Sequence, residues 1–320
     1  MKKQIRIEEM KKNQIDLCVD LWMKQFHECT HNQEFHLLWS NKTEYICDFL
    51  KDKVHNKEAI VAFVDQQIVG YLVYESFTFH DAKTAFVPFI GNAAMSEERS
   101  AIYTVMYQSI AKNWVQKEIK NHYLMIPYWE ETLKQTLFDI GFGAYVVDAF
   151  SKPHALICEK ELSNEIEIVK AQECDVEELT LLVKNSNDYY AESPIFLMRE
   201  EVSMEEVRNF VKERDVFLAK KDARIIGFMN ASISKETDLI ALCLEQFRLI
   251  DEIGAYILEE YRGMNIGYRL LNEIMNASIS EKCPMIHVDF ETANSYGNCF
   301  WKKYFIPEML SVKRVIHADF

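Results

Sequence analysis

The sequence predicts an α+β protein made of two tandem domains of one fold, each a mixed, mostly antiparallel sheet flanked by helices. Three observations carry this prediction. A chain of 320 residues can bury two separate cores. Runs rich in β-branched and aromatic residues alternate with runs of helical spacing. The same order of runs occurs in both halves of the chain.

The elements of the first half follow from local patterns. Helices are expected where apolar residues recur every three or four positions, and a hairpin where two β-like runs flank the polar break at 65–67. Gly141 can close a helix in the left-handed conformation. The expected elements are a strand at 5–7, a helix at 15–22, helix and loop at 27–57, strands at 59–64, 68–74 and 84–90, a helix from Ser96, a strand at 122–128, a helix at 130–139 and a final strand at 155–158.

Fragments of the first half recur in the second half at offsets of about 160 residues. The matching pairs are 5–7 with 166–168, 62–71 with 219–228, and 138–142 with 301–305. Three matches in one order indicate a duplicated unit. Pro153 and the charged run at 159–165 interrupt the pattern between the halves. We therefore expect one domain at 1–155 and the other at 160–320.

Composition narrows the class of protein. The formal net charge is −14 without a basic stripe to offset it, which argues against nucleic acid or an anionic membrane as a partner. No apolar run reaches the ~18–20 residues of a membrane helix. The N-terminal lysines precede no apolar signal-peptide segment. The eight cysteines include no CxxC pair and indicate free thiols in a reducing cytosol. We expect a cytoplasmic monomer or homodimer.

The histidines and cysteines predict no metal site. His27, His31 and His36 have no Asp, Glu or Cys partners arranged around them. The cysteines are scattered without ligand spacing. We therefore expect the protein to work without a bound metal ion.

The most informative stretch is the loop at 262–267, which contains two glycines. It follows an apolar run that ends at Leu258 and an acidic turn at 259–260. An amphipathic run follows, with Leu270, Leu271, Ile274 and Met275 on one face. The sequence thus predicts a strand, a tight loop and a helix. The start of such a helix can bind phosphate, because its N–H groups and its dipole attract an anion.

The order of elements and the run YILEEYRGMNIGYRLL resemble the acetyl-CoA-binding core of the GCN5-related N-acetyltransferase (GNAT) superfamily. The family's loop pattern, Arg/Gln-x-x-Gly-x-Gly/Ala, is carried here by Arg262, Asn265 and Gly267. Asn265 departs from the usual glycine, but asparagine tolerates a left-handed backbone. The later fragment from Asn294 to Phe305 resembles the family's next segment.

This resemblance implies that the second half binds acetyl-CoA as the acyl donor. Main-chain N–H groups of 264–268 would surround the pyrophosphate, and the main chain of 255–257 would pair with the pantetheine amides. Asn294 would lie beside the pantetheine arm, and Phe300 would pack against the cofactor. The expected cofactor-binding residues are Ala255, Tyr256, Ile257, Arg262, Gly263, Met264, Asn265, Ile266, Gly267, Tyr268, Asn294 and Phe300.

The resemblance also implies direct attack of an amine on the acetyl carbonyl, with a base for the amine proton and an acid for the departing thiolate. Trp301 occupies the position where the family often has a tyrosine that acts as the general acid. An indole ring cannot usefully donate a proton near neutral pH. Tyr296 is our preferred acid and Tyr304 the alternative; the competing interpretation is a structural role for both. Glu252 is the preferred base, with Asp289 or Glu291 as alternatives. A solvated strand-end carboxylate is an equal interpretation for Glu252.

The first half lacks the glycines of the loop. The equivalent place reads from Met95 to Tyr103, where Ser96 can cap a helix and Glu97 and Glu98 complement its dipole. Negative side chains there oppose a pyrophosphate. We expect residues 1–155 to keep the fold without the cofactor and to cover the acceptor cleft of the second half.

Two classes of function remain open. The first is an acetyl-CoA-dependent N-acetyltransferase that acts on an unknown acceptor, either a small amine or a peptide. The second is a non-catalytic CoA-binding protein, because Asn265 and Trp301 both depart from the family's pattern. Acceptor contacts are expected from the aromatic-rich segments 27–57 and 188–210, although those aromatic residues fit a plain core equally well.

Overall fold

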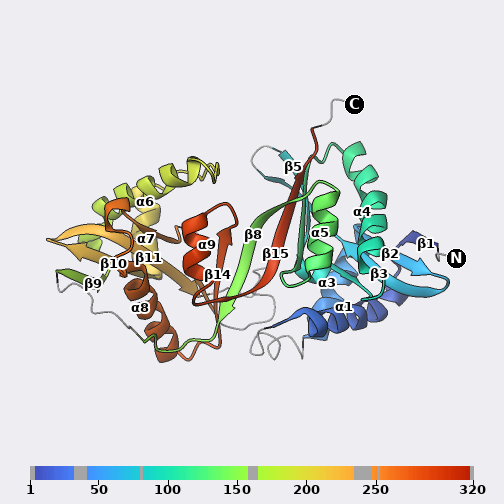
Figure 1. Cartoon of the computed structure of the whole chain (residues 1–320), viewed down its shortest axis with the longest axis horizontal. Coiled ribbons are helices and arrows are strands. Elements are labelled where there is room, and N and C mark those ends of the chain that lie inside the picture. Colours follow the sequence, from blue (N-terminus) through green and yellow to red (C-terminus); the bar gives the residue numbers. More distant parts are fainter. Residues whose placement is uncertain are drawn as a thin grey trace. The chain divides into compact units, whose positions relative to one another are not determined.

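The computed structural model describes residues 4–31, 42–79, 82–157, 165–233, 247–250 and 253–317. The chain divides into two compact units, each of which is considered by itself (Figure 1). Unit 1 comprises Met1–Ala149 and Ile306–Phe320, and unit 2 comprises Phe150–Phe305. The last segment of the chain thus belongs to the first unit, whereas the sequence suggested that it ends the second domain.

Unit 1 contains the helices and strands of the first half together with the last strand of the chain. They are β1 (Ile5–Glu9), η1 (Lys12–Gln14), α1 (Ile15–Cys29), α3 (Thr43–His55), β2 (Ala59–Val64), β3 (Gln67–Val73), β4 (Glu75–Phe79), β5 (Ala82–Val87), η2 (Phe89–Gly91), β6 (Asn92–Ala94), α4 (Arg99–Gln116), β7 (Asn121–Pro127), α5 (Glu131–Asp139), β8 (Gly143–Ser151) and β15 (Ile306–Val315). Strand β8 ends two residues beyond the unit's boundary.

Unit 2 repeats this order. Its elements are β9 (Ile166–Lys170), η3 (Glu173–Asp175), α6 (Val176–Ala191), α7 (Met204–Glu213), β10 (Asp215–Lys221), β11 (Arg224–Ile233), β12 (Arg248–Ile250), β13 (Ala255–Ile257), η4 (Glu259–Tyr261), α8 (Ile266–Ser280), β14 (Ile286–Glu291) and α9 (Ser295–Trp301).

The two hairpins show that the sequence repeat is a structural repeat. Strands β2 and β3 pair with a register shift after Ala62, and β10 and β11 pair with a shift after Ala219. Both turns begin with an aspartate in the left-handed conformation, Asp65 at φ 56° and Asp222 at φ 51°. The predicted α+β fold of two similar units is therefore confirmed, including parallel strand pairs, β5 with β7 and β12 with β14.

Strand β15 completes the sheet of unit 1. It lies between β7 and β8 and pairs antiparallel with β7, from Met309 opposite Pro127 to Val315 opposite Asn121. In Figure 1 it is the long red strand beside the green β8. Alternating apolar residues predict a strand but not the sheet edge that it joins, because that edge depends on the tertiary structure.

Several expected boundaries in unit 1 were wrong. The strand expected at 84–90 ends at Val87, because Pro88 has no N–H to continue the ladder and η2 follows. The helix expected from Ser96 begins at Arg99. Residues 155–157 form no strand, and Cys158 lies outside the described residues. The last strand of the first half is instead β8, whose exposed first residues obscure its pattern.

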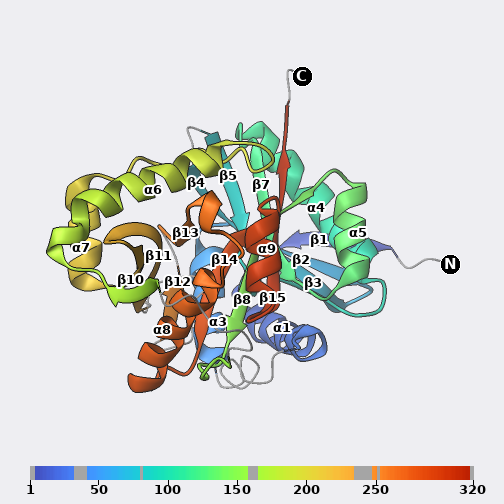
Figure 2. The ribbon, with the colours of Figure 1, turned by 60° about the vertical axis from the view of Figure 1, so that its left-hand side comes forward.

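The sheet of unit 2 opens at β13. Strand β11 pairs with β13 through Gly227–Met229 and with β12 through Ser232–Ile233, while β14 pairs with β12. Among the described residues, β13 thus has a strand on one edge only. In Figure 2, β10 and β11 lie between α8 and the pair α6 and α7. The open edge of β13 faces the start of α8 and α9, where the cavity described below lies.

A buried histidine should make unit 1 sensitive to acid. His122 is fully buried, with Nδ1 2.8 Å from the Tyr107 hydroxyl oxygen and Nε2 3.2 Å from the Ile119 carbonyl oxygen. Burial, helped by nearby Arg314 and opposed by the hydrogen bond with the Ile119 carbonyl, lowers the pKa of His122 to about 4. As the pH falls, His122 is therefore protonated at a higher pH in the unfolded state than in the folded state, which favours unfolding. Between pH 7 and pH 4 this group should remove about 3 kcal/mol from the free energy of unfolding.

Denaturant titrations at several pH values, followed through the adjacent Trp114, measure this loss. The ring centroids of Trp114 and His122 are 4.8 Å apart. The variant His122→Phe has no group to titrate and should show a flatter pH dependence. An unchanged slope in the variant would assign the acid sensitivity to other groups.

Candidate active site

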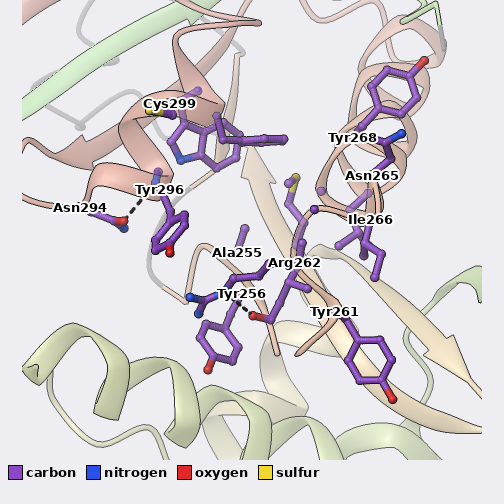
Figure 3. A pocket seen from close by; sticks show the side chains of 18 of the residues that line it. Ala255, Tyr256, Tyr261, Arg262, Asn265, Ile266, Tyr268, Asn294, Tyr296 and Cys299 are labelled. Carbon is purple, nitrogen blue, oxygen red and sulfur yellow. Dashed lines mark hydrogen bonds between the residues drawn. The ribbon is translucent and has the colours of Figure 1, made fainter. Parts of the chain in front are cut away.

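A cavity of about 370 Å³ lies in unit 2 where β13, the loop after it, α8, α9 and the end of α6 meet (Figure 3). It brings together most residues that the sequence singled out. The lining includes Ala255, Tyr256, Ile257, Arg262, Gly263, Asn265, Ile266, Gly267, Tyr268, Asn294, Tyr296 and Phe300. Met264 is 51% exposed and is absent from the lining.

The loop before α8 places main-chain N–H groups at the start of the helix. Gly263 has φ +81°, and Asn265 adopts the left-handed conformation (φ 59°) as the residue that precedes the helix. The first hydrogen bond of the helix runs from Arg269 N to Asn265 O, at 3.2 Å. The N–H groups of Ile266 and Gly267 precede this bond and have no i−4 acceptor within the helix. They form a site that favours an anion.

Gly267 leaves room for a close approach at the helix start. A Cβ atom placed on it would lie 3.0 Å from Phe300 Cε2 and 3.5 Å from Ile257 Cδ1. The first distance is shorter than ordinary van der Waals contact. The ring of Phe300 thus packs on the backbone of Gly267, and a side chain at 267 would displace it.

The open edge of β13 offers main-chain groups to a ligand. Asn230 N bonds Gly254 O at 2.8 Å, and Leu258 N bonds Ile226 O at 3.0 Å, so alternate residues of β13 point their main chain toward β11. The main-chain groups of Ala255 and Ile257 therefore point to the open edge. An extended chain with amide groups can pair with this edge as an added strand would.

Asn294 links α9 to the end of α6. Its Oδ1 accepts hydrogen bonds from Gly297 N at 3.0 Å and from the Tyr189 hydroxyl at 3.1 Å, and its Nδ2 donates to the Tyr190 hydroxyl at 3.3 Å. Burial raises the pKa of Tyr190 to about 12. The sequence allowed either a cleft or a core position for Tyr189 and Tyr190, and both residues line the cavity.

The structure brings only some of the candidate acids and bases to the cavity. Tyr296 lines it and is 64% exposed, and Tyr304 lines it as well. Asp289 is exposed on β14 and does not line it. Glu291 is 8% exposed and pairs with Arg199 at 3.6 Å. Glu252 lies outside the described residues.

In unit 1, the equivalent segment before α4 has a similar backbone conformation but different side chains. Glu98 precedes α4 in the same left-handed conformation (φ 59°) as Asn265. Ser96 does not cap this helix, contrary to expectation, since the helix begins later and no side chain caps it. Arg99 follows Glu98 as Ile266 follows Asn265, and it is only 8% exposed.

Arg99 is held by ionic contacts inside unit 1. Its guanidinium pairs with Glu130 and, at 2.8 Å, with Glu28, while Nε donates to the Ala94 carbonyl at 3.2 Å. Two carboxylates thus lie beside the start of α4. Such an arrangement repels a phosphate, in contrast to the loop of unit 2.

Within the described ranges, no three His, Cys, Asp or Glu side chains are grouped so that they could hold a metal ion. None of the helices in those ranges has the length and apolarity needed to cross a lipid bilayer.

Comparisons with known proteins place the fold. Residues 180–304 match the model of the acetyltransferase (GNAT) family. A search of curated proteins gives no match. The chain resembles the structure of a GCN5-related N-acetyltransferase from Sphaerobacter thermophilus, with 9% identity and a TM-score of 0.56, over 99% of this chain and 97% of that one.

Two further solved structures match. One contains the GCN5-related glucosamine N-acetyltransferase region of a fungal multi-domain GH3 β-N-acetylglucosaminidase; the match has 11% identity and a TM-score of 0.54, over 98% of this chain and 38% of that one. The other is a tandem GNAT protein from the clavulanic acid biosynthesis pathway, with 10% identity, a TM-score of 0.48 and 98% coverage of both chains. At these identities the matches with TM-scores above 0.5 show a shared fold.

Proposed function

The chain belongs to the GNAT superfamily, and on this premise we propose that it is an acetyl-CoA-dependent N-acetyltransferase whose one donor site is the cavity of unit 2. The observation that carries the proposal is the loop at 262–267. Its N–H groups at the start of α8 fit a pyrophosphate, and the open edge of β13 beside it fits the amides of pantetheine. The two features lie in one cavity.

Acetyl-CoA would supply an acyl carbon activated as a thioester. A neutral amine of the acceptor forms the new C–N bond, the C–S bond breaks, and the thiolate takes a proton. Tyr296 is the proposed acid, because its hydroxyl belongs to a cavity-lining side chain. Glu252 remains the proposed base, with Asp289 and Glu291 as alternatives. The proposed acceptor is a small amine or a peptide, met in the cytoplasm by a monomer or homodimer.

A thiol-release assay with acetyl-CoA and a panel of amines tests the proposal. We expect turnover with at least one amine, and a lower kcat for Tyr296→Phe with little change in the KM for acetyl-CoA, since the ring stays. The second candidate is a CoA-binding protein without activity. It is favoured by Trp301, which lines the cavity at the position where the family often has a tyrosine as general acid. Tight CoA binding without turnover of any amine would support that candidate and contradict ours.

We further propose that unit 1, our domain 1–155 together with β15, binds no CoA. Arg99 and its carboxylate partners are the reason, because they put negative charge beside the start of α4. Isothermal titration of the full chain with CoA should therefore give one site per chain. A stoichiometry of two would show that unit 1 also binds the cofactor.

A further inference from the structure

Three tyrosine rings from three elements surround one cation in the cavity. Tyr189 comes from α6, Tyr256 from β13 and Tyr296 from α9. The guanidinium carbon of Arg262 lies 4.7, 5.6 and 5.3 Å from their ring centroids, in that order. All three distances are within the range of cation–π attraction. Figure 3 shows Arg262 reaching back from the loop toward Tyr256 and Tyr296. We call these three rings the tyrosine cage.

Arg262 is held in the cage differently from the buried arginines of the protein. Arg99 and Arg248 each pair with two carboxylates. In the described part of the chain, Arg262 has no carboxylate partner within ion-pair distance; its Nε donates only to the Ile257 carbonyl, at 3.1 Å. That carbonyl points to the open edge of β13, where the pantetheine is proposed to pair. Arg262 and the bound donor therefore compete for one acceptor atom.

A phosphate is a better partner for a guanidinium than aromatic rings, because charge-assisted, two-pronged hydrogen bonds are the stronger contact. Arg262 begins the loop that is proposed to receive the pyrophosphate. The proposed donor would compete for the Ile257 carbonyl and offer Arg262 a phosphate partner next to it. The cage is then left open to another cation.

We infer that the tyrosine cage is the subsite for a guanidinium group of the acceptor, and that Arg262 fills this subsite until the donor displaces it. The inference rests on the proposed function, since donor and acceptor share the cavity. An amine must be neutral to attack the acyl carbon, so the caged group is a second charge on the acceptor. The acceptor is accordingly an amine that also carries a guanidinium.

The first experiment needs neither donor nor turnover. Arg262→Ala empties the cage, and methylguanidinium should then bind at least tenfold more tightly than methylurea, its neutral analogue of the same shape. Wild-type protein without CoA should bind methylguanidinium at least tenfold more weakly than Arg262→Ala does, because its own guanidinium fills the cage. Chemical-shift or calorimetric titration of the full chain measures both.

Two variants in the Arg262→Ala background locate the subsite. Tyr256→Leu removes a ring of the cage and should abolish the preference for methylguanidinium. Tyr261→Leu is the matched control, because Tyr261 lines the same cavity without facing the Arg262 guanidinium, and it should keep the preference. Equal binding of methylurea and methylguanidinium, or equal effects of the two tyrosine variants, would overturn the cage.

The second experiment tests the acceptor role. With acetyl-CoA, kcat/KM for 4-aminobutylguanidine should exceed that for 4-aminobutylurea at least tenfold in wild-type protein, and Tyr256→Leu should bring the ratio near one. Equal turnover of both amines would overturn the acceptor role and leave the proposed function standing. Turnover of neither amine, nor of any other in the panel, would overturn both.

Discussion

Gly267→Glu is expected to lower the affinity for CoA at least about a hundredfold. The new Cβ would lie 3.0 Å from the ring of Phe300, and the carboxylate would stand at the N–H groups proposed to hold the pyrophosphate. Like charges brought together at a binding site cost several kcal/mol, and a factor of one hundred corresponds to about 2.7 kcal/mol. Calorimetric titration with CoA measures the loss, with circular dichroism as a check that the variant is folded.

The duplicated fold supplies a matched control. Ser100 follows Arg99 in unit 1 as Gly267 follows Ile266 in unit 2. Ser100→Glu adds the same charge at the start of α4, where no cofactor is proposed to bind, and CoA affinity should not change. Wild-type affinity in folded Gly267→Glu, or equal losses in the two variants, would remove the pyrophosphate from the start of α8.

The variant Arg99→Met should destabilise unit 1 by about 3 kcal/mol. Arg99 is 8% exposed and satisfies both Glu28 and Glu130. When one partner of a buried ionic group is removed, the remaining charges stay in the interior without compensation, and such changes cost about 3–5 kcal/mol. We take the lower end, because Glu28 is partly exposed. Denaturant unfolding gives the free-energy change, and CoA binding by unit 2 should be unaffected.

Arg208→Met is the comparison at an exposed site. Arg208 also contacts two carboxylates, Glu173 and Glu205, but all three side chains reach solvent. Exposed ion pairs contribute little, because water and salt screen them. The unfolding transition should therefore stay where it is in Arg208→Met. Similar transitions for Arg99→Met and Arg208→Met would mean that the buried cluster does not stabilise unit 1.

The fold and the loop at 262–267 could be predicted because each depends on sequence patterns within short segments of the chain. The hairpins carry their turn residues with them, so that Asp65 and Asp222 appear at matching places in the sequence and in the structure. The left-handed conformation of Asn265 follows from its own chemistry and from the glycines beside it. In each case the information lies within about ten residues of the chain.

The features that the sequence did not reveal depend on contacts between distant segments. Tyr189, Tyr256 and Tyr296 meet around Arg262 only when α6, β13 and α9 pack together. The burial of Arg99 could not be predicted either, because an arginine that follows two glutamates is typical of a solvent-exposed helix start. Asp289 was chosen for its strand, yet its exposed side chain does not line the cavity. If the register of a strand is wrong by one residue, every side chain is assigned to the opposite face of the sheet.

The position of β15 has a consequence for how the protein is made. Unit 1 receives this strand between β7 and β8, yet residues 306–315 leave the ribosome only after all of unit 2. Until then the nascent first unit carries two unpaired strand edges, which are prone to pair with other chains. Translation therefore cannot finish the units one after the other, and a gene cut between the halves would encode an N-terminal fragment that lacks a central strand.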